Sequence, residues 1–290
     1  MPPVAVVSDT THYLPRQLVE ASGITLVSLY VNFDGTRTER EGSMTDFDGF
    51  YDELRSSTDR LPTTSQPSVG DFVAAYEPLL AAGRDIVSIH LSEGLSGTCA
   101  SARQAADALE KEGKGGEQIR VVDSSSACGG FGMMVLAAAR SAAAGADLDS
   151  VVEHARRARE ESKMWFAIDT LEYLKRGGRI GGVSAWVGST LKIKPILTVE
   201  SEIRPVERVR TSARAFERLV DYARQRHASR ADAWVVQHVQ SAEQAELLVE
   251  RCREIFERDP LFVSEVGPVI GAQTGPGLLG VGSVPERYLV

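Results

Sequence analysis

The fold is decided by residues 85–126, which read DIVSIHLSEGLSGTCASARQAADALEKEGKGGEQIRVVDSSS. This stretch holds an apolar run, a turn rich in Ser and Gly, a helix predicted from about Ser96 to Glu112, and a second apolar run. Short apolar runs that alternate with helical segments are typical of parallel strands connected by helices. The stretch therefore predicts an α/β fold in which helices flank a parallel sheet.

The same pattern continues on both sides of this stretch within the first half of the chain. VAVVSD predicts a strand, and ITLVSLYVNFDGTRTE predicts two strands around a turn at Asp34–Gly35. Capping boxes at Thr45–Asp48 and Ser68–Asp71 predict the starts of two helices. Two further helices are predicted over GGFGMMVLAAARSAAAG and from about Asp147 to Ser162. We therefore expect the first half to form a mostly parallel sheet with helices.

The second half of the chain differs in its order of elements. MWFAID predicts a strand, TLEYLKRGGR a short helix, and KPILTVESEIRPVERVR a hairpin that turns at Glu200 to Glu202. ARAFERLVDYARQRH predicts a helix, DAWVVQHV a strand, the next segment a helix to about Arg258, and LFVSEVG a strand. We expect a second α/β domain with a mixed sheet, and we place the domains at residues 1–162 and 163–290.

Composition excludes several classes of function. The chain has 290 residues, of which 43% are hydrophobic and 25% charged, as in a globular protein. Its net charge of −8 argues against a nucleic-acid partner, because phosphate neutralisation requires clustered Lys and Arg. No apolar run has the length of a membrane span, and MPPVAVVSDTT does not resemble a signal peptide. These observations predict a cytoplasmic protein.

Cysteine and histidine spacing gives no sign of a metal site. The three cysteines, Cys99, Cys128 and Cys252, lie far apart and read as reduced packing residues. The five histidines show neither H-x-x-x-H nor H-E-x-x-H spacing. We therefore expect no bound metal and no cofactor.

Hydroxyl groups gather in three turns that follow predicted strands. The carboxyl ends of parallel strands meet at one edge of a sheet, which is where ligands bind in open α/β folds. Helix N-termini and hydroxyls together can hold a carboxylate or phosphate without a formal positive charge. The same residues can instead serve only as helix caps, each contributing about 1 kcal/mol. The turns contain Ser8, Asp9, Thr10 and Thr11; Ser92, Ser96 and Thr98; and Asp123 with the three serines 124–126.

A fourth polar stretch, LPTTSQPSVGDF at residues 61–72, can serve both as a helix cap and as part of an anion site. Ser68 and Asp71 have the spacing of a capping box, so they are assigned to the helix that follows. Thr64 and Ser65 precede the cap and are free to face the ligand end of the sheet. The stretch thus predicts a helix cap and an anion-binding site formed by hydroxyl groups.

Two short motifs resemble known sites without meeting their requirements. GPGLLG at residues 275–280 matches G-x-G-x-x-G, but only ten residues follow it, too few for a dinucleotide-binding unit. Ser96 lies in GLSGT, which is not the G-x-S-x-G of a nucleophile elbow. A serine-type acyl hydrolase that uses Ser96 with His90 stays open as an alternative, as does a carrier of another anionic small molecule.

Six stretches that span essentially the whole chain are, in order, TTSQPS, SEGLSGT, VVDSSSACGGFG, TLEYLKRGGRI, LKIKPIL and GPVIGAQTGPGLLGV. Together they resemble the DegV family of bacterial fatty-acid-binding proteins. The resemblance implies a non-catalytic, lipid-carrying subunit of fatty acid kinase. It implies two α/β domains with a long-chain fatty acid in a buried tunnel at their junction. It also implies a separate, dihydroxyacetone-kinase-like subunit that uses ATP to phosphorylate the presented carboxylate.

The resemblance assigns a head-group site residue by residue. Thr64 of TSQPS and Ser96 of LSGT match the hydroxyls that contact the carboxylate in the family. Gln273 stands where the family usually has a His before TGPG, and Gln donates a hydrogen bond but does not titrate near neutral pH. Cys99 stands where the family commonly has Tyr. We expect the full site to comprise Thr64, Ser65, Ser96, Gly97, Thr98, Gln273 and Thr274.

Two further groups of residues are assigned to the ligand chain and to the partner. Each apolar candidate for the tunnel has the alternative of being ordinary core. Basic residues of LKRGGRI complement a helix C-terminus, or form a docking patch for the kinase subunit that includes Arg176 and Arg179. The tunnel candidates are Phe166, Ile168, Leu191, Ile193, Ile196, Ile270, Leu278 and Leu279.

Overall fold

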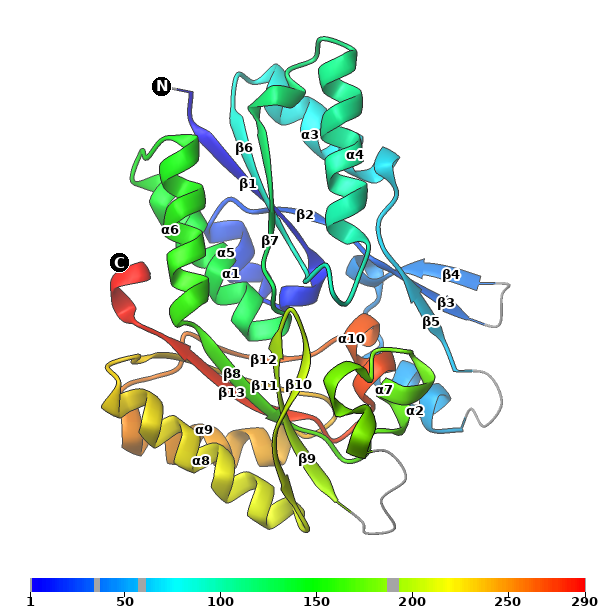
Figure 1. Ribbon diagram of the computed structural model, residues 1–290, viewed down its shortest axis with the longest axis vertical. Coiled ribbons are helices and arrows are strands. Elements are labelled where there is room, and N and C mark those ends of the chain that lie inside the picture. Colours follow the sequence, from blue (N-terminus) through cyan, green and yellow to red (C-terminus); the bar gives the residue numbers. More distant parts are fainter. Residues whose placement is uncertain (1, 34–36, 57–60, 187–192, 290) are drawn as a thin grey trace.

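The computed structural model describes residues 2–33, 37–56, 61–186 and 193–289. Its strands form a four-stranded sheet, a six-stranded sheet and a three-stranded sheet (Figure 1). The predicted α/β class, with a parallel sheet flanked by helices and a mixed sheet with helices, is confirmed. The predicted Asp34–Gly35 turn lies outside the described residues.

The four-stranded sheet has the order β2-β1-β6-β7, and every neighbouring pair is parallel. Alternate residues of β1 point to opposite faces, because side chains alternate along a strand. Ala5 and Val7 pack against α3 and α4, whereas Val4 and Val6 pack against α5 and α6. The elements are β1 (Val4–Asp9), β2 (Thr25–Val27), β6 (Asp85–His90), β7 (Ile119–Asp123), α1 (Arg16–Ala21), α3 (Val69–Ala81), α4 (Thr98–Lys111), α5 (Cys128–Ala143) and α6 (Leu148–Glu161).

The six-stranded sheet has the order β10-β9-β8-β13-β11-β12 and is mixed. Strand β13 is central and runs antiparallel to both of its neighbours, while β11 and β12 are parallel. Helices α8 and α9 cover one face, and α5 packs on the other. The elements are β8 (Lys163–Ala167), β9 (Lys194–Glu200), β10 (Glu202–Val209), β11 (Ala233–His238), β12 (Phe262–Glu265), β13 (Leu279–Val284), α8 (Ser212–Ala228) and α9 (Ala242–Phe256).

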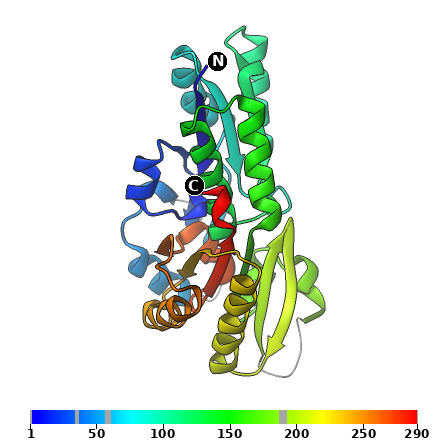
Figure 2. The same cartoon turned by 90° about the vertical axis from the view of Figure 1, so that its left-hand side faces the viewer.

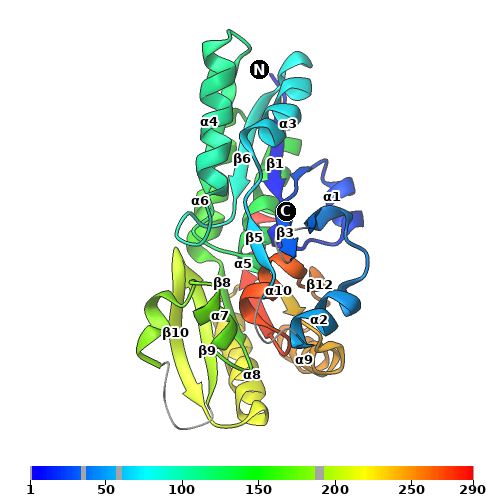
Figure 3. The ribbon, with the colours of Figure 1, turned by 90° about the vertical axis from the view of Figure 1, so that its right-hand side faces the viewer.

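The three-stranded sheet has the order β4-β3-β5, and all its strands come from the first half of the chain. Strands β3 and β5 contact helix α10, which comes from the second half. Helix α10 packs against β5, α2 and α7, as Figure 3 shows. Tyr51 of α2 donates a hydrogen bond to Val266 O at 2.7 Å. Residues from the first half therefore lie beside the six-stranded sheet, and the division at residue 162 stays a prediction. The elements are β3 (Tyr30–Phe33), β4 (Arg37–Arg40), β5 (Thr63–Ser65), α2 (Phe47–Ser56), α7 (Glu172–Arg176) and α10 (Pro268–Thr274).

Five short 3₁₀ helices complete the elements of the described chain. They are η1 (Thr10–His12), η2 (Glu41–Ser43), η3 (Gly116–Gln118), η4 (Gly181–Trp186) and η5 (Glu286–Tyr288). Two of them, η1 and η2, follow strands β1 and β4 directly, and they bring Tyr13 and Glu41 together.

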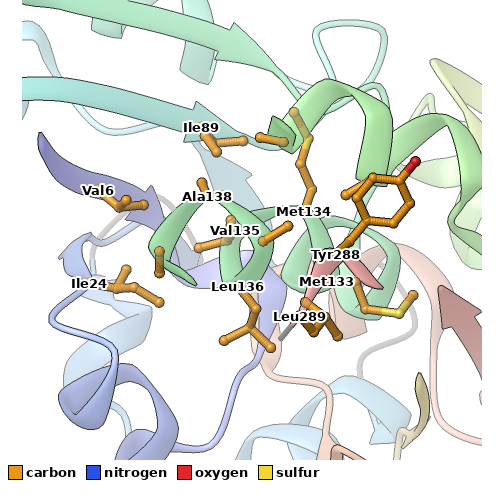
Figure 4. Close-up of a cluster of buried hydrophobic side chains, with 14 of the residues drawn as sticks. Val6, Ile24, Ile89, Met133, Met134, Val135, Leu136, Ala138, Tyr288 and Leu289 are labelled. Atoms are coloured by element: carbon orange, nitrogen blue, oxygen red, sulfur yellow. The ribbon is translucent and has the colours of Figure 1, made fainter. Parts of the chain in front are cut away.

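Helix α5 is the element that joins the two large sheets. Its residues from Gly129 to Ala139 are all buried. Figure 4 shows its side chains projecting on several sides, toward Val6 and Ile89 of the parallel sheet and toward Leu289 at the C-terminus. An apolar surface on all sides is typical of a helix enclosed by other elements.

The structure confirms one of the two predicted capping boxes, corrects the other, and contains elements that were not predicted. The capping box at Ser68–Asp71 is confirmed by hydrogen bonds in both directions. The box at Thr45–Asp48 is wrong, because Asp46 Oδ1 instead accepts from Gly49 N at 2.8 Å. Strand β5, helix α10 and the central strand β13 were not predicted.

Candidate functional site: a cavity between the three sheets

A cavity lies between the six-stranded sheet, strand β5 of the three-stranded sheet and the turns that follow β6 and β7 of the parallel sheet. Its internal space of about 80 Å³ exceeds the roughly 10–15 Å³ that one buried water requires on the same measure. Most of its wall is apolar, and the polar residues of the wall on β5, on α10 and in the Ser96 turn are together called the polar group. The apolar wall consists of Leu29, Leu91, Leu95, Ala127, Met164, Phe166, Leu174, Val199, Ile203, Val266, Val269, Ile270 and Leu278.

Thr64 and Gln273 form one side of the polar group. Thr64 lies on β5, where it pairs with Val31 of β3, and Gln273 lies in the last turn of α10. Gln273 Nε2 donates to Thr64 Oγ1 at 3.2 Å. A Cβ at Gly177 would lie 1.8 Å from Gln273 Oε1, so glycine at 177 lets this side chain keep its present position. The Gly-Gly of LKRGGR therefore has a direct structural role at the cavity.

Ser96 forms the other side of the polar group, in the turn between β6 and α4. Its Oγ lies 2.9 Å from Thr98 Oγ1, and its N–H donates to Ser92 O at 3.0 Å. Gly97, the N-cap of α4, has no side chain to satisfy the free N–H groups of that helix. The turn thus offers hydroxyl and backbone donors next to the cavity.

The predicted head-group residues do not all reach the cavity wall. Thr64, Ser65, Ser96, Gln273 and Thr274 line it. Gly97 and Thr98 adjoin Ser96 but are not part of the wall, and Thr98 is buried.

Gln66 lines the cavity and was not predicted as a site residue. Its Nε2 lies 3.1 Å from where a Cβ at Gly97 would be, so its amide extends across the Ser96 turn. Gln66 thereby connects the β5 side of the polar group with the α4 side. Its position directly after Thr64 and Ser65 was the available signal.

The two predicted docking arginines have different surroundings. Arg179 lines the cavity, where its Nη1 donates to Gly177 O at 2.6 Å and its Nε to Leu95 O at 3.4 Å. Arg176 does not line the cavity; it is exposed on α7 and forms an ion pair with Glu172 at 2.8 Å. Arg179 is the one arginine or lysine among the described residues of the wall.

Some of the apolar tunnel candidates line the cavity and others do not. Phe166, Ile270 and Leu278 line the cavity. Ile196 and Leu279 instead point to the face of the sheet that α8 and α9 cover. Ile168 is buried beside the cavity without lining it, Ile193 is partly exposed away from the wall, and Leu191 lies outside the described residues.

Cys128 also lines the cavity, at the first turn of α5. Burial, with the Glu41 carboxylate nearby, raises the pKa of its thiol well above the ordinary value. The thiol therefore stays protonated near neutral pH and contributes as a small apolar group. Cysteine spacing alone gave no signal for this position.

His90 is not placed to activate Ser96. Its Nδ1 lies 3.1 Å from Asp9 Oδ2 and its Nε2 lies 2.6 Å from Ser88 Oγ, with all three residues buried. Burial favours a higher pKa for Asp9, but hydrogen bonds from His90 and from the Thr11 side chain outweigh it and lower the pKa. This network connects strands β1 and β6 internally, and Ser96 Oγ instead contacts Thr98.

The part of the chain that the structure describes contains neither a metal-binding group nor a membrane-spanning helix. No group of three or more His, Cys, Asp or Glu side chains there is arranged to hold a metal ion. In the same residues, no helix combines the length and apolar character needed to cross a bilayer.

A family model described as "Uncharacterised protein, DegV family" matches residues 3–286. The chain belongs to the DegV family. A DegV domain-containing protein of Streptomyces coelicolor is 40% identical over 281 residues, which cover 96% of this chain and 97% of that protein. Protein DegV of Bacillus subtilis is 33% identical over 282 residues, covering 96% of this chain and 98% of that protein.

Solved structures of DegV proteins share this fold. A DegV family protein from Thermus thermophilus, described as fatty acid binding, is 32% identical with a TM-score of 0.84, over 98% of this chain and 99% of that chain. DegV from Bacillus subtilis, described as a fatty acid binding protein, is 32% identical with a TM-score of 0.85, over 98% and 100%. The fold of these DegV structures is therefore present in this chain.

Proposed function

We propose that this protein binds a long-chain fatty acid in the cavity, with the carboxylate at the polar group. The observation that carries the proposal is a mostly apolar cavity whose wall includes the hydroxyls of Thr64 and Ser96 and the Gln273 amide, which is hydrogen-bonded to Thr64. The fatty acid binding described for the DegV proteins of Thermus thermophilus and Bacillus subtilis supports it.

The apolar wall would supply most of the affinity. Burial of an acyl chain contributes about 0.8 kcal/mol per CH₂, or on the order of 12 kcal/mol for about sixteen carbons before ordering costs. The wall comes from β8, β9, β10 and α10 and from the turns that follow β6 and β7, so the chain would be enclosed on several sides. The polar group would then mainly fix the direction in which the ligand lies.

The carboxylate would be held by neutral donors. Charge-assisted hydrogen bonds from Thr64, Ser65, Ser96, Gln273 and Thr274 offset the cost of removing the anion from water. Gly97 and Thr98 shape the turn that carries Ser96. A carboxylate bound in this way stays nucleophilic toward a γ-phosphate. The site therefore suits a non-catalytic subunit that presents its ligand to a separate, ATP-dependent kinase subunit in the cytoplasm.

Arg176 and Arg179 are proposed to contact that kinase subunit. Arg179 lies at the cavity wall beside the Ser96 turn, and Arg176 is exposed three residues earlier. Both would face a partner that approaches the carboxylate. We propose the 1–162 and 163–290 domains as the carboxylate side and the acyl-chain side of the site, with β5 and α2 beside α10.

Native mass spectrometry of the purified protein, with lipid extraction after denaturation, tests the proposal. We expect one fatty acid of about fourteen to eighteen carbons per chain, the range whose burial gives on the order of 11–14 kcal/mol. Thr64→Ala with Ser96→Ala should lower the affinity for added fatty acid by roughly tenfold or more, since two charge-assisted hydrogen bonds are lost. Thr63→Ala is the matched control, because Thr63 is exposed on the same strand and does not line the cavity.

Other outcomes point to specific alternatives. Equal affinity in the double variant and the control would place the carboxylate elsewhere. A different anion in the extract would identify a carrier for that ligand. Labelling of Ser96 by a fluorophosphonate probe would favour the serine-type hydrolase over the carrier.

A further inference from the structure

Helix α10 carries Gln273 but does not cap its own N-terminus. Its N-cap residue, Gly267, has no side chain, and Pro268 at the first position has no N–H. The next two N–H groups bind side chains that are more than 220 residues away in sequence. Val269 N donates to Glu41 Oε1 at 2.8 Å, and Ile270 N donates to Tyr13 OH at 3.1 Å.

Glu41 and Tyr13 form a buried cluster with complete hydrogen bonding. Glu41 is only 4% exposed. Besides Val269 N, its carboxylate accepts from Tyr13 OH at 2.8 Å and from Thr10 Oγ1 at 2.6 Å. A buried carboxylate requires such partners, because an unpaired charge in the interior is strongly destabilising. The cluster therefore joins the ends of β1 and β4 to the start of α10.

Two glycines let α10 lie directly against this cluster and against α2. A Cβ at Gly267 would lie 2.7 Å from Tyr13 Cε1 and 2.9 Å from Glu41 Oε1. A Cβ at Gly271 would lie 2.0 Å from Tyr51 OH. Residues four apart lie on the same side of a helix, so this side of α10 is fixed by contacts with residues 10–51. Residues Ile270, Gln273 and Thr274 of the same helix line the cavity.

We propose that Glu41 and Tyr13 are positioning residues, which hold α10 so that Gln273 stays against Thr64 at the polar group. The effect on a ligand rests on the proposed function, whereas the placement of Gln273 does not. Loss of either side chain leaves a buried N–H of α10 without a partner, and a shift of the helix relieves this most easily. The Gln273–Thr64 distance of 3.2 Å is at the upper end for an N–H···O bond, so a small shift of α10 breaks it.

Tyr13→Phe and Glu41→Leu, which remove the acceptors of Ile270 N and Val269 N, test the placement of Gln273 without any ligand. The probe is the side-chain amide resonance of Gln273 in the ¹H–¹⁵N spectrum, assigned by its disappearance in Gln273→Ala. Tyr76→Phe is the matched control, because Tyr76 is also a buried tyrosine with a hydrogen bond, to Ser88, and does not contact α10. We expect the resonance to move in the first two variants and not in the control. An unmoved resonance in both Tyr13→Phe and Glu41→Leu would overturn the proposal.

Fatty-acid affinity gives the second readout. With palmitate as the probe, we expect Tyr13→Phe to weaken binding about fivefold in the wild-type background and less than about twofold in the Gln273→Ala background. An equal loss in both backgrounds would show that Tyr13 acts on the cavity without Gln273, which contradicts the proposal. If the wild-type protein takes up no palmitate while the Gln273 resonance still moves, the proposed function fails and the positioning role stands.

Discussion

His12 is buried between β1 and α5 with one hydrogen bond to its ring. Its Nδ1 accepts from Leu14 N at 2.9 Å, which places the proton of the neutral ring on Nε2. Nε2 has no hydrogen-bond partner among the described residues, and the ring lies 5.6 Å from that of Phe131. Burial lowers the pKa of His12 to about 4. The imidazole is therefore neutral in the folded protein at any pH above this value.

This residue makes stability depend on pH in a defined direction. Unfolded His12 has a pKa near 6.5, so between pH 6.5 and about 4 the unfolded chain binds a proton that the folded chain does not. As the pH falls from 6.5 to about 4, the free energy of unfolding should decrease by on the order of 3 kcal/mol because of His12 alone. In His12→Asn the Asn Oδ1 is expected to accept from Leu14 N in place of the ring. Urea denaturation at pH 7 and pH 4.5 should show a smaller loss in the variant, and an equal loss would refute this origin.

At the residue scale, hydroxyls were easier to place from the sequence than the groups that support them. Ser68 and Asp71 cap α3 because a cap depends on residues only three apart. Thr64, Ser96 and Gln273 all line the cavity, and their role in holding a carboxylate stays a prediction. Glu41, which holds α10, gave no local signal, because its partners lie more than 25 residues away on either side.

The β9–β10 hairpin contacts β8 along β9 and other elements at its tip. Strand β9 pairs with β8 at Phe166↔Leu197 and Ala167↔Ile196, and in the half nearer the tip Thr198 Oγ1 donates to Met164 O at 2.8 Å. Figure 2 shows this half reaching toward the parallel sheet. Its tip residue, Ser201, accepts from Ser92 Oγ at 2.6 Å and donates to Ser125 O at 3.0 Å. The hairpin thereby closes one side of the cavity.

Loss of one tip contact should loosen the hairpin locally. In Ser92→Ala the hydroxyl bond to Ser201 O disappears, which should make exchange of the Ser201 amide roughly fivefold faster, the factor for about 1 kcal/mol. Hydrogen exchange of the peptide over residues 194–209, followed by mass spectrometry, measures this. Ser56→Ala is the control, because it removes an exposed hydroxyl–carbonyl bond on α2. Faster exchange in both variants, or in neither, would contradict this role of the hydrogen bond between Ser92 and Ser201.

At the element scale, elements with a regular apolar pattern were predicted from the sequence. Elements whose conformation depends on tertiary contacts were missed. The hairpin around Ser201 and helices α4, α5, α6, α8 and α9 were predicted, since each has a clear apolar pattern. Strand β13 was missed because Gly280 and Gly282 interrupt its pattern. Those glycines leave room for Met164, whose atoms lie within about 3 Å of where a Cβ at either position would be.

At the scale of the whole molecule, helix α5 packs between the two large sheets and contacts strands of both. Gly129, the second residue of this helix, lies against the six-stranded sheet: a Cβ there would lie 2.8 Å from Val235 Cγ2 and 2.9 Å from Met164 Sδ. Its N–H donates to Gln237 Oε1 of β11. The distance between the sheets is therefore set partly by the absence of one methyl group.

Gly129→Ala and Gly70→Ala make a matched pair that separates this contact from helix propensity. Gly70 is also the second residue of its helix, α3, but it is exposed, and its Cβ would meet nothing closer than Ser68 Oγ at 3.7 Å. Gly70→Ala should stabilise the protein by about 0.4–1 kcal/mol, because the unfolded chain loses freedom. Gly129→Ala should instead destabilise it by about 1–3 kcal/mol, because the added methyl overpacks the interface between the sheets. Urea denaturation of both variants measures the two signs. A gain at both positions would mean that α5 tolerates the methyl, and that another contact sets the separation of the sheets.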